Sequence, residues 1–276
     1  MGGGGKATAV GGANYRRKAV TGRALILTYH AVEAGPSPLC VSPELFRAQL
    51  QALREGGAHA LTISQLVAAI EAGSVPPRTV AITFDDGFVS VVREAAPLLV
   101  EHDLRATVFC VAGHLGGAND WPTQRPGSPQ RALAGASDLA ELARTGFEIG
   151  SHGFEHAPLG AAMDVSLERE LRSSKELLQD ALQSRVSSFA YPYGSIPEGA
   201  GARMVRELYD CACTTVLDTA RAGSDPHALP RVDAHYLRRP ALLRRALEGS
   251  LGSYLQLRRI GARVRRLVLK DYALPQ

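Results

Sequence analysis

The sequence predicts a wound α/β fold in one domain. Short apolar runs alternate with amphipathic stretches from about residue 24 to residue 248. Several of these runs are apolar throughout instead of alternating with polar residues, as expected for parallel strands that are covered on both faces. Strands that alternate with helices in this way indicate either an open sheet or a closed barrel.

Seven apolar runs are the expected strands. They are Ala24–Tyr29, Thr79–Phe84, Ala106–Ala112, Glu148–Ser151, Ser187–Tyr191, Cys211–Val216 and Leu229–Val232. In parallel α/β folds the functional groups gather at the carboxyl ends of the strands. The residues that directly follow these runs are therefore the first candidates for a functional site.

Helices are expected between the runs. Ser42 and Pro43 are typical of an N-cap followed by proline at the first helical position. Apolar side chains then follow at helical spacing, at Phe46, Leu50 and Leu53. Amphipathic patterns predict further helices at Asp164–Leu182, Glu94–His102 and Asp138–Arg144. The segment Gly113–Ala136, rich in Gly, Pro, Asn and Ser, is expected to be a long loop, and such loops are often functional.

The composition is that of an ordinary globular protein, but its charge is unevenly placed. The 276 residues are 45% hydrophobic and 21% charged, with a formal net charge of +4. Ten basic residues and one acidic residue, Glu248, lie between Arg238 and Lys270, so the rest of the chain is net acidic. This excludes a uniformly basic nucleic-acid binder. We expect a flexible lead over residues 1–22, one α/β domain over 23–236 and a basic helical extension over 237–276.

The chain ends and the cysteines bear on location. The glycine-rich start lacks the apolar stretch of a signal peptide, and no run of eighteen apolar residues occurs, so a cytoplasmic protein is expected. The basic extension is expected to contact an anionic membrane surface, to bind an acidic polysaccharide, or to pack on the domain as a solvated helix. Buried reduced thiols are expected at Cys40, Cys110, Cys211 and Cys213.

Two acidic residues follow the run Thr79–Phe84. Asp85 and Asp86 precede Gly87, where the strand is expected to end and turn. Adjacent side chains that leave a strand diverge in direction, so one carboxylate can bind a metal while the other faces a substrate. The alternative is an Asp-Asp-Gly turn that caps the next helix.

Two histidines follow the run Glu148–Ser151. His152 and His156 are four residues apart, which places two imidazoles on one side of a helical turn. The alternative is a pair of solvated or core histidines. One carboxylate with two imidazoles is the ligand set of an open catalytic site for zinc or a similar divalent ion.

Three motifs together resemble the polysaccharide deacetylase family, carbohydrate esterase family 4. They are TFDDG (Thr83–Gly87), SHGFEH (Ser151–His156) and FAYPYG (Phe189–Gly194), and they occur in the order of the family. The resemblance covers roughly residues 24 to 235. It implies a distorted (β/α)7-type barrel, a bound zinc-like ion, and hydrolysis of N-acetyl groups on an amino sugar of a polysaccharide or glycan precursor.

The resemblance also implies roles for single residues. The metal ligands are matched by Asp86, His152 and His156. Asp85 matches the general base, which takes a proton from a metal-activated water. Pro192 and Tyr193 match the segment that contacts the substrate, and the Tyr193 N–H matches an oxyanion donor.

The sequence departs from the family pattern in two places. The third motif has no arginine, and the late Leu-x-x-His motif that supplies the general acid is missing. A branch similar to exopolysaccharide poly-N-acetylglucosamine deacetylases places this histidine in the first strand, and TYH (Thr28–His30) matches that order. His30 is therefore the expected acid, with His235 as the alternative. Arg231 is expected to supply the missing positive charge near Asp85.

The single tryptophan, Trp121, lies in the expected loop. It is either a core anchor or a flat platform for a sugar at the rim of the cleft. Three other functions stay open, namely a metal amidohydrolase on a small amide, an O-acetyl esterase on a polysaccharide, and an inactive glycan-binding barrel. The last is disfavoured, because a decayed site would be expected to lose at least one of its four Asp and His residues.

Overall fold

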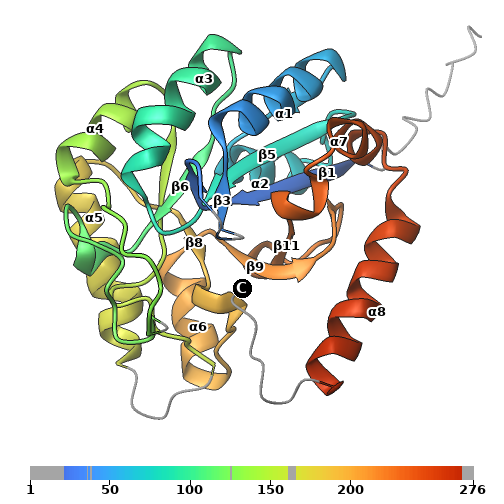
Figure 1. The fold of residues 1–276 in the computed structure, drawn as a ribbon. Coiled ribbons are helices and arrows are strands. Elements are labelled where there is room, and N and C mark those ends of the chain that lie inside the picture. The colour runs from blue at the N-terminus through green and yellow to red at the C-terminus, as the bar shows by residue number, and fades with distance from the viewer. Residues whose placement is uncertain (1–21, 36, 38, 125, 161–165, 269–276) are drawn as a thin grey trace, which may run out of the picture.

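A closed barrel of parallel strands, surrounded by helices, forms the body of the molecule (Figure 1). The computed structural model describes residues 22–35, 37, 39–124, 126–160 and 166–268. The barrel strands are β1 (Arg23–Tyr29), β5 (Thr79–Phe84), β6 (Thr107–Cys110), β7 (Glu148–Ser151), β8 (Ser188–Ala190), β9 (Cys211–Leu217) and β11 (Leu229–Asp233). Because β1 pairs in parallel with both β5 and β11, the sheet closes. The barrel implied by the family resemblance is confirmed, and the open sheet is excluded.

The barrel is irregular, and short strands extend its sheet. Strands β7 and β8 share one residue pair, and the register shifts between β9 and β11. β4 (His59–Ala60) pairs with the start of β5, and β10 (Ala220–Arg221) pairs antiparallel with the start of β1. β2 (Ala31–Val32) and β3 (Cys40–Val41) form a separate parallel pair. These two-residue strands were not predicted, because they are too short to leave a periodic pattern.

Helices cover the outer wall of the barrel (Figure 1). They are α1 (Pro43–Glu55), α2 (Ile63–Glu71), α3 (Ala96–Glu101), α4 (Ala136–Arg144), α5 (Ser174–Leu182), α6 (Gly199–Leu208), α7 (Pro240–Leu247) and α8 (Gly252–Val268). Two π-helical segments, η1 (Val91–Ala95) and η3 (Glu168–Ser173), precede α3 and α5. Short 3₁₀ turns are η2 (Ala112–His114), η4 (Pro192–Gly194), η5 (Pro226–Ala228) and η6 (Ala234–Leu237). The predicted N-cap is confirmed, because the Ser42 hydroxyl accepts the Leu45 N–H at 3.3 Å.

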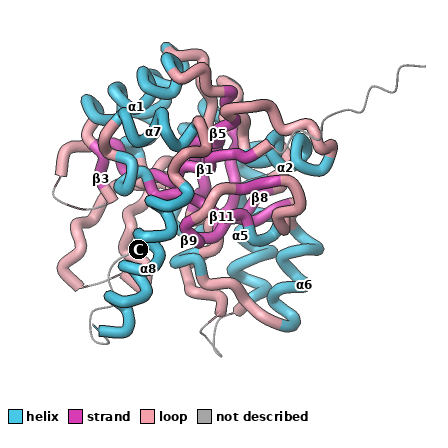
Figure 2. Tube along the Cα trace, turned by 90° about the vertical axis from the view of Figure 1, so that its right-hand side faces the viewer, coloured by secondary structure: helices cyan, strands magenta, loops and turns pink. Residues whose placement is uncertain are grey.

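Two hydrophobic clusters follow from the alternation of side chains along each strand. On β1, Ala24 and Ile26 belong to the inner cluster, whereas Leu25 and Leu27 belong to the outer cluster beneath the helices. Helix α2 contributes Ile63, Leu66 and Val67 to the inner cluster and so covers the amino-terminal end of the barrel. Figure 2 shows the strands enclosed by the helices. The carboxyl end of the barrel is left for polar residues.

Several predicted boundaries differ from the structure. The strand expected at Ala106–Ala112 ends at Cys110, because Ala112 begins η2. The helix expected at Glu94–His102 begins earlier, at Val91, and Asp138–Arg144 extends back to Ala136. The start of the helix expected at Asp164–Leu182 lies partly outside the described residues, as does nearly all of the lead expected over residues 1–22. All four cysteines are buried free thiols, as expected.

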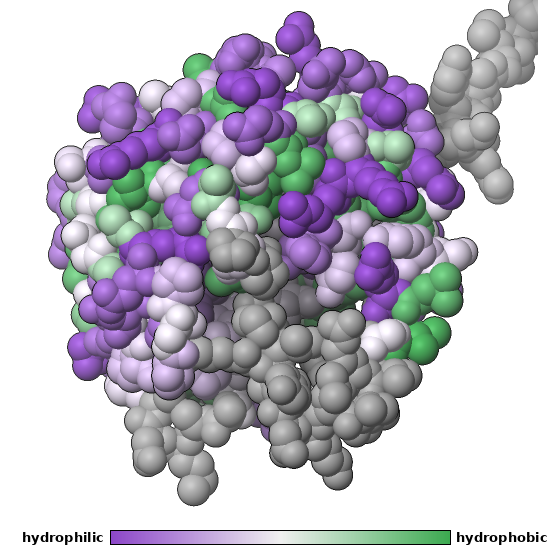
Figure 3. Space-filling view, viewed as in Figure 1, coloured by the Kyte–Doolittle hydropathy of each residue, from purple (hydrophilic) through white to green (hydrophobic). Residues whose placement is uncertain are grey.

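The first part of the basic extension belongs to the packed core. Leu243, Leu247 and Leu255 are less than 8% exposed, and Arg244 lies 3.3 Å from Glu55 of α1. Helix α8 then continues along the edge of the domain (Figure 1), where Leu257 and Ile260 are 69% and 58% exposed. Apolar side chains are visible at this edge in Figure 3. Among the described residues, no helix is long and apolar enough to cross a membrane.

Candidate active site

The predicted acidic and histidine pairs meet at the carboxyl end of the barrel. Asp85 directly follows β5, and its backbone N–H donates to the carbonyl of Tyr29 at the end of β1. His152 directly follows β7, and its N–H donates to the carbonyl of Cys110 at the end of β6. The Asp pair therefore begins beside the end of β1, and the His pair begins beside the end of β6. The barrel brings together two motifs that are more than sixty residues apart in the sequence.

Three side chains form a compact cluster with the donor types of a metal site. One ligand atom from each of Asp86, His152 and His156 lies within 4.8 Å of the other two. Oδ1 of Asp86 lies 3.6 Å from Nε2 of His152 and 3.5 Å from Nε2 of His156. These distances are too long for strong hydrogen bonds. The cluster has the shape expected when a cation, instead of a proton, joins the three groups.

The hydrogen bond of His152 fixes which of its nitrogens faces the cluster. Its Nδ1 lies 2.8 Å from the carbonyl oxygen of Ala190, so Nδ1 carries the proton and donates it. In the neutral ring, Nε2 then presents a lone pair toward Asp86. This is the arrangement in which a histidine ligates a metal while its other nitrogen is held by a carbonyl. The donor set therefore fits a divalent ion.

Burial acts in opposite directions on the pKa values of two cluster residues. Asp86, His152 and His156 are 5%, 2% and 6% exposed. Burial lowers the pKa of His156 well below its usual value, which favours the neutral imidazole. Burial also raises the pKa of Asp86, so the ionised carboxylate is costly in the absence of a cation. The Nδ1 atom of His156 is buried with no hydrogen-bond partner among the described residues.

Three of the six described non-glycine residues with a positive φ angle lie at this site. Asp86, His156 and Tyr193 have positive φ angles of 72°, 57° and 57°, a region that side-chain-bearing residues rarely adopt. Such conformations persist only where the surroundings enforce them, and they cluster at functional sites. The strain at Asp86 also argues against the alternative that the Asp pair serves only as an ordinary helix cap.

Asp85 is held by a buried bidentate ion pair. Its two carboxylate oxygens accept hydrogen bonds from the Arg231 guanidinium at 2.6 and 2.7 Å, and Arg231 is 2% exposed. Burial alone would raise the pKa of Asp85, but the guanidinium holds it well below its usual range. The structure therefore places Arg231, from β11, directly beside Asp85. The pair keeps Asp85 ionised and fixed in orientation.

The two candidate acids occupy different positions. His30 is half-buried directly after β1, within range of an electrostatic interaction with both Asp85 and Asp86. His235 is exposed in η6, where its backbone N–H donates to the carboxylate of Asp233. Of the two candidates, His30 is the one with an electrostatic interaction with the two carboxylates among the described residues.

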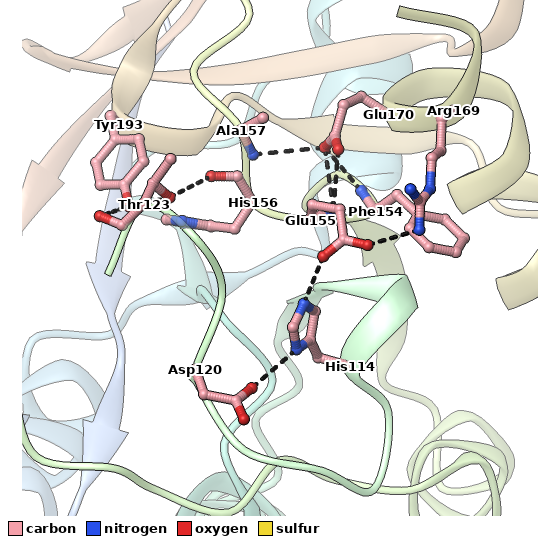
Figure 4. Close-up of polar contacts among 10 residues, drawn as sticks. All are labelled: His114, Asp120, Thr123, Phe154, Glu155, His156, Ala157, Arg169, Glu170 and Tyr193. Atoms are coloured by element: carbon pink, nitrogen blue, oxygen red, sulfur yellow. Dashed lines mark hydrogen bonds and ion pairs between the residues drawn. The ribbon is translucent and has the colours of Figure 1, made fainter. Parts of the chain in front are cut away.

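The segment Pro192–Tyr193 lies beside the histidines at the end of β8. Its η4 turn places the Tyr193 ring 4.5 Å from the ring of His156, and Pro192 is buried. The Thr123 hydroxyl lies 2.9 Å from the Tyr193 hydroxyl and donates to the His156 carbonyl at 3.1 Å (Figure 4). The long loop at 113–136 thus contacts both the histidine segment and the tyrosine segment, through a residue that the sequence did not single out.

Trp121 packs against a proposed metal ligand. Its ring centroid lies 4.4 Å from that of His156, and the residue is 3% exposed. This position agrees with the core-anchor interpretation. A sugar platform at the rim would need an exposed ring face, which Trp121 does not offer in this structure.

A second set of polar residues surrounds the histidine segment and was missed in the sequence (Figure 4). Glu170 of η3 is 3% exposed and accepts backbone N–H groups of the histidine segment, and the Glu155 side chain contacts His114 and Arg169. A sign of the unusual role of Glu170 was present in the residue pattern of the helix expected over Asp164–Leu182. Glu170 lies on the apolar stripe, at helical spacing between Leu167 and Ser174, where a charge is unexpected.

Comparison with known sequences gives one family and a consistent set of relatives. The family described as polysaccharide deacetylase matches residues 72–208. YxkH of Bacillus subtilis, named provisionally as a polysaccharide deacetylase, is 26% identical over 75% of this chain and 70% of its own length. The poly-beta-1,6-N-acetyl-D-glucosamine N-deacetylase of Staphylococcus aureus is 26% identical over 56% of this chain. The chain spans about half (53%) of the staphylococcal protein.

Comparison with solved structures gives the same fold. The Streptococcus pyogenes deacetylase PplD, solved with acetate, has a TM-score of 0.66 and 25% identity over 77% of this chain and 92% of that chain. IcaB from Ammonifex degensii has a TM-score of 0.67 over 81% of this chain and 97% of that chain. At 22% identity, the second likeness bears on the fold alone.

Proposed function

The chain belongs to the polysaccharide deacetylase family, and we propose that it removes N-acetyl groups from an amino sugar within a polysaccharide, with a divalent metal ion bound by Asp86, His152 and His156. The observation that carries this proposal is the convergence of three buried ligand atoms within 4.8 Å, with the His152 tautomer fixed by Ala190. Zinc is the ion that we propose, because two imidazoles and one carboxylate suit it. The poly-N-acetylglucosamine substrate of the staphylococcal relative is the first polymer to test.

The bound ion would polarise the acetyl carbonyl and lower the pKa of a water molecule. Asp85 is our candidate for the base that takes a proton from the attacking water. Arg231 orients this carboxylate and keeps it ionised at neutral pH, at some cost in basicity. The acid step falls to His30, which gives its proton to the amine nitrogen as the C–N bond breaks. The products are acetate and a free amine on the sugar.

The developing negative charge on the acetyl oxygen needs a donor. We assign this role to the backbone N–H of Tyr193, whose positive φ angle turns the η4 backbone sharply next to His156. One such donor is typically worth about 3 kcal/mol of transition-state stabilisation. Pro192, buried beside it, would fix the position of this turn.

The decisive experiment measures released acetate and new amine groups together. Zinc-loaded protein is incubated with β-1,6- and β-1,4-linked N-acetylglucosamine oligomers, nucleotide sugars, O-acetylated xylan and a small aryl acetamide. We expect acetate with an equal amount of amine from a glucosamine polymer. Acetate from xylan alone would favour the esterase alternative, and turnover of the aryl amide alone would favour the small-amide hydrolase. Binding without turnover of any substrate would favour the inactive barrel.

Two matched variants distinguish loss of the metal site from a general effect of removing a carboxylate. Asp86→Asn removes the carboxylate of the proposed metal cluster, whereas Asp180→Asn removes an exposed carboxylate of α5. We expect loss of acetate release in the first and full activity in the second. Full activity in both would contradict the assignment of the metal cluster.

For the basic extension, we propose contact with an anionic membrane surface. Helix α8 exposes Leu257 and Ile260, and the sequence of the extension carries ten basic residues and one acidic residue between Arg238 and Lys270. Each basic residue near an anionic leaflet contributes about 1 kcal/mol. The protein should sediment with vesicles that contain phosphatidylserine and not with neutral vesicles, and failure to sediment at low salt would contradict the proposal. The expected cytoplasmic location stays a prediction.

A further inference from the structure

A buried carboxylate that takes no part in the proposed chemistry holds the segment that carries both histidines. Oε2 of Glu170 accepts the backbone N–H of Phe154 at 2.9 Å, and Oε1 accepts that of Glu155 at 2.9 Å. The N–H of Ala157 lies 3.5 Å from Oε2. Both oxygens therefore act as acceptors for the turn between His152 and His156 (Figure 4).

The position of Glu170 is costly without these contacts. The residue is 3% exposed, and no ion pair with a cation is found for it among the described residues. An ionised carboxylate at such a site is stable when several N–H groups donate to it. It lies in the π-helical segment η3, a type of distortion that is frequent at functional sites.

A glycine in the histidine segment lets the Glu170 carboxylate approach the backbone closely. Gly153 has a φ angle of +84°, and a Cβ atom placed there would lie 2.6 Å from Oε2 of Glu170. Gly153 is thus needed both for its backbone conformation and for the close approach of Glu170. The glycine of the SHGFEH motif and a helix residue seventeen positions later fit one another.

The same segment is held from its outer side by its own Glu155. This carboxylate accepts a hydrogen bond from the Arg169 guanidinium at 2.7 Å and lies 2.9 Å from Nε2 of His114. Nδ1 of His114 in turn lies 3.2 Å from Asp120 (Figure 4). Glu155 is more exposed than Glu170, so these contacts support the segment, whereas Glu170 provides its buried attachment.

We propose that Glu170 is a positioning residue that shapes the His152–His156 segment for metal binding before the metal arrives. It acts through the backbone N–H groups of the turn, so that the imidazoles already face Asp86 in the metal-free protein. This inference rests on the metal site of the proposed function, but it does not depend on the reaction or on the sugar. Residues that hold metal ligands from behind typically change metal affinity by 10–100-fold.

The hydrogen bonds of the Glu170 carboxylate can be tested with a glutamine in its place. Glu170→Gln preserves shape but turns one acceptor oxygen into an NH₂ group, which must then face a backbone N–H at 2.9 Å. Two donors in contact leave the N–H unsatisfied in a buried place. Glu168→Gln is the matched control, because Glu168 lies in the same π-helical segment, η3, as Glu170, but its side chain pairs with Arg172 on the exposed surface.

Two measurements test the proposal. The first is amide hydrogen exchange of Phe154, Glu155 and Ala157 in the metal-free proteins, and the second is the zinc dissociation constant from competition with a chelator. We expect Glu170→Gln to speed exchange of these amides at least about tenfold, with the barrel strands unchanged, and to weaken zinc binding 10–100-fold. Glu168→Gln should match the wild-type protein in both.

Each outcome decides the matter. Wild-type exchange and zinc affinity in Glu170→Gln, or equal changes in both variants, overturn the proposal. If Glu170→Gln loses protection throughout the barrel, Gly153→Ala replaces it, because its Cβ displaces the carboxylate from the other side. Wild-type values in that variant also overturn the proposal. A wild-type protein that binds no zinc would refute the metal site, while the exchange comparison would still test Glu170.

Discussion

Each end of the barrel holds a buried or half-buried carboxylate at the end of a strand, but the two carboxylates have different neighbours. At the amino-terminal end, Glu148 of β7 accepts the backbone N–H and the hydroxyl of Ser64 and the hydroxyl of Thr107, at 2.7 to 3.0 Å. At the carboxyl end, Asp86 faces two imidazole nitrogens at 3.5 and 3.6 Å. Among the described residues, no comparable donor reaches Asp86.

This difference separates a carboxylate whose hydrogen bonds are satisfied within the fold from one that we propose binds a metal ion. The carboxylate of Glu148 is satisfied by donors from α2 and β6, and it thereby attaches α2 to the amino-terminal end of the barrel. Asp86 faces the Nε2 lone pair of His152 and lies in a strained conformation. The acidic character of a strand-end residue is therefore uninformative by itself, and the groups around its carboxylate indicate whether it serves the fold or could hold a cation.

The largest effect is expected when one side chain is changed at each end of the barrel. His152→Ala deletes an imidazole of the metal cluster, and we expect metal affinity to fall by more than the roughly 100-fold typical of supporting residues, with activity at background. Glu148→Gln should retain a full equivalent of metal while it lowers stability. Metal analysis after dialysis measures both. A full equivalent of tightly bound zinc in His152→Ala would contradict the ligand assignment.

A second test separates the two adjacent aspartates. Asp85→Asn keeps the shape of the side chain and removes its basicity, so turnover should fall by at least about a hundredfold while zinc stays bound. The unpaired Arg231 should also destabilise the fold by about 3–5 kcal/mol. Acetate release and metal content are measured on folded protein, as judged by circular dichroism. Near-normal turnover would mean that the base lies elsewhere.

A third test asks which histidine belongs to the carboxyl-end cluster. His30→Ala should abolish the alkaline limb of the rate profile, because an acid must be protonated to act. His235→Ala should leave the profile unchanged, since His235 is exposed in η6. The rate is measured from pH 5 to 10 for both variants. Loss of the limb in His235→Ala alone would reverse the assignment.

The smallest effect is expected for an ion pair on the surface. Arg206 and Asp225 are 2.7 Å apart with side chains 53% and 43% exposed, so Arg206→Met should cost no more than about 1 kcal/mol. The hydrogen bond from Arg206 lowers the pKa of Asp225 below its value in the unfolded chain. The pair therefore stabilises the protein above about pH 4, and this contribution is lost as the pH falls further. Urea unfolding at pH 7 and pH 3 should show a larger difference between wild type and variant at pH 7 than at pH 3.

Residue patterns predicted much of this protein. The seven barrel strands were located within a few residues, because long apolar runs record burial on both faces. The Asp and His pairs were found because they follow strands directly. Residues alone did not distinguish a closed barrel from an open sheet, since closure depends on the pairing of β1 with β5 and β11, which leaves no local pattern.

Other features required the structure for physical reasons. The Glu170 contacts are made to backbone groups, which every residue possesses, so no sequence motif marks the partner. Arg231 was predicted beside Asp85 from the absence of another arginine, but the geometry of the pair depends on two strands brought together by barrel closure. Helices α2 and α6 were not predicted from the sequence, and the two-residue strands were missed because they are too short to leave a periodic pattern.

The Arg231–Asp85 pair joins positions 146 residues apart, from the last barrel strand to the end of the second. Contacts of such sequence separation form late, because the loop they close must first lose its conformational entropy. During synthesis, the first strand must wait for β11 to leave the ribosome before the barrel can close. The guanidinium that orients the proposed base belongs to that strand, so closure of the barrel also completes the Arg231–Asp85 pair.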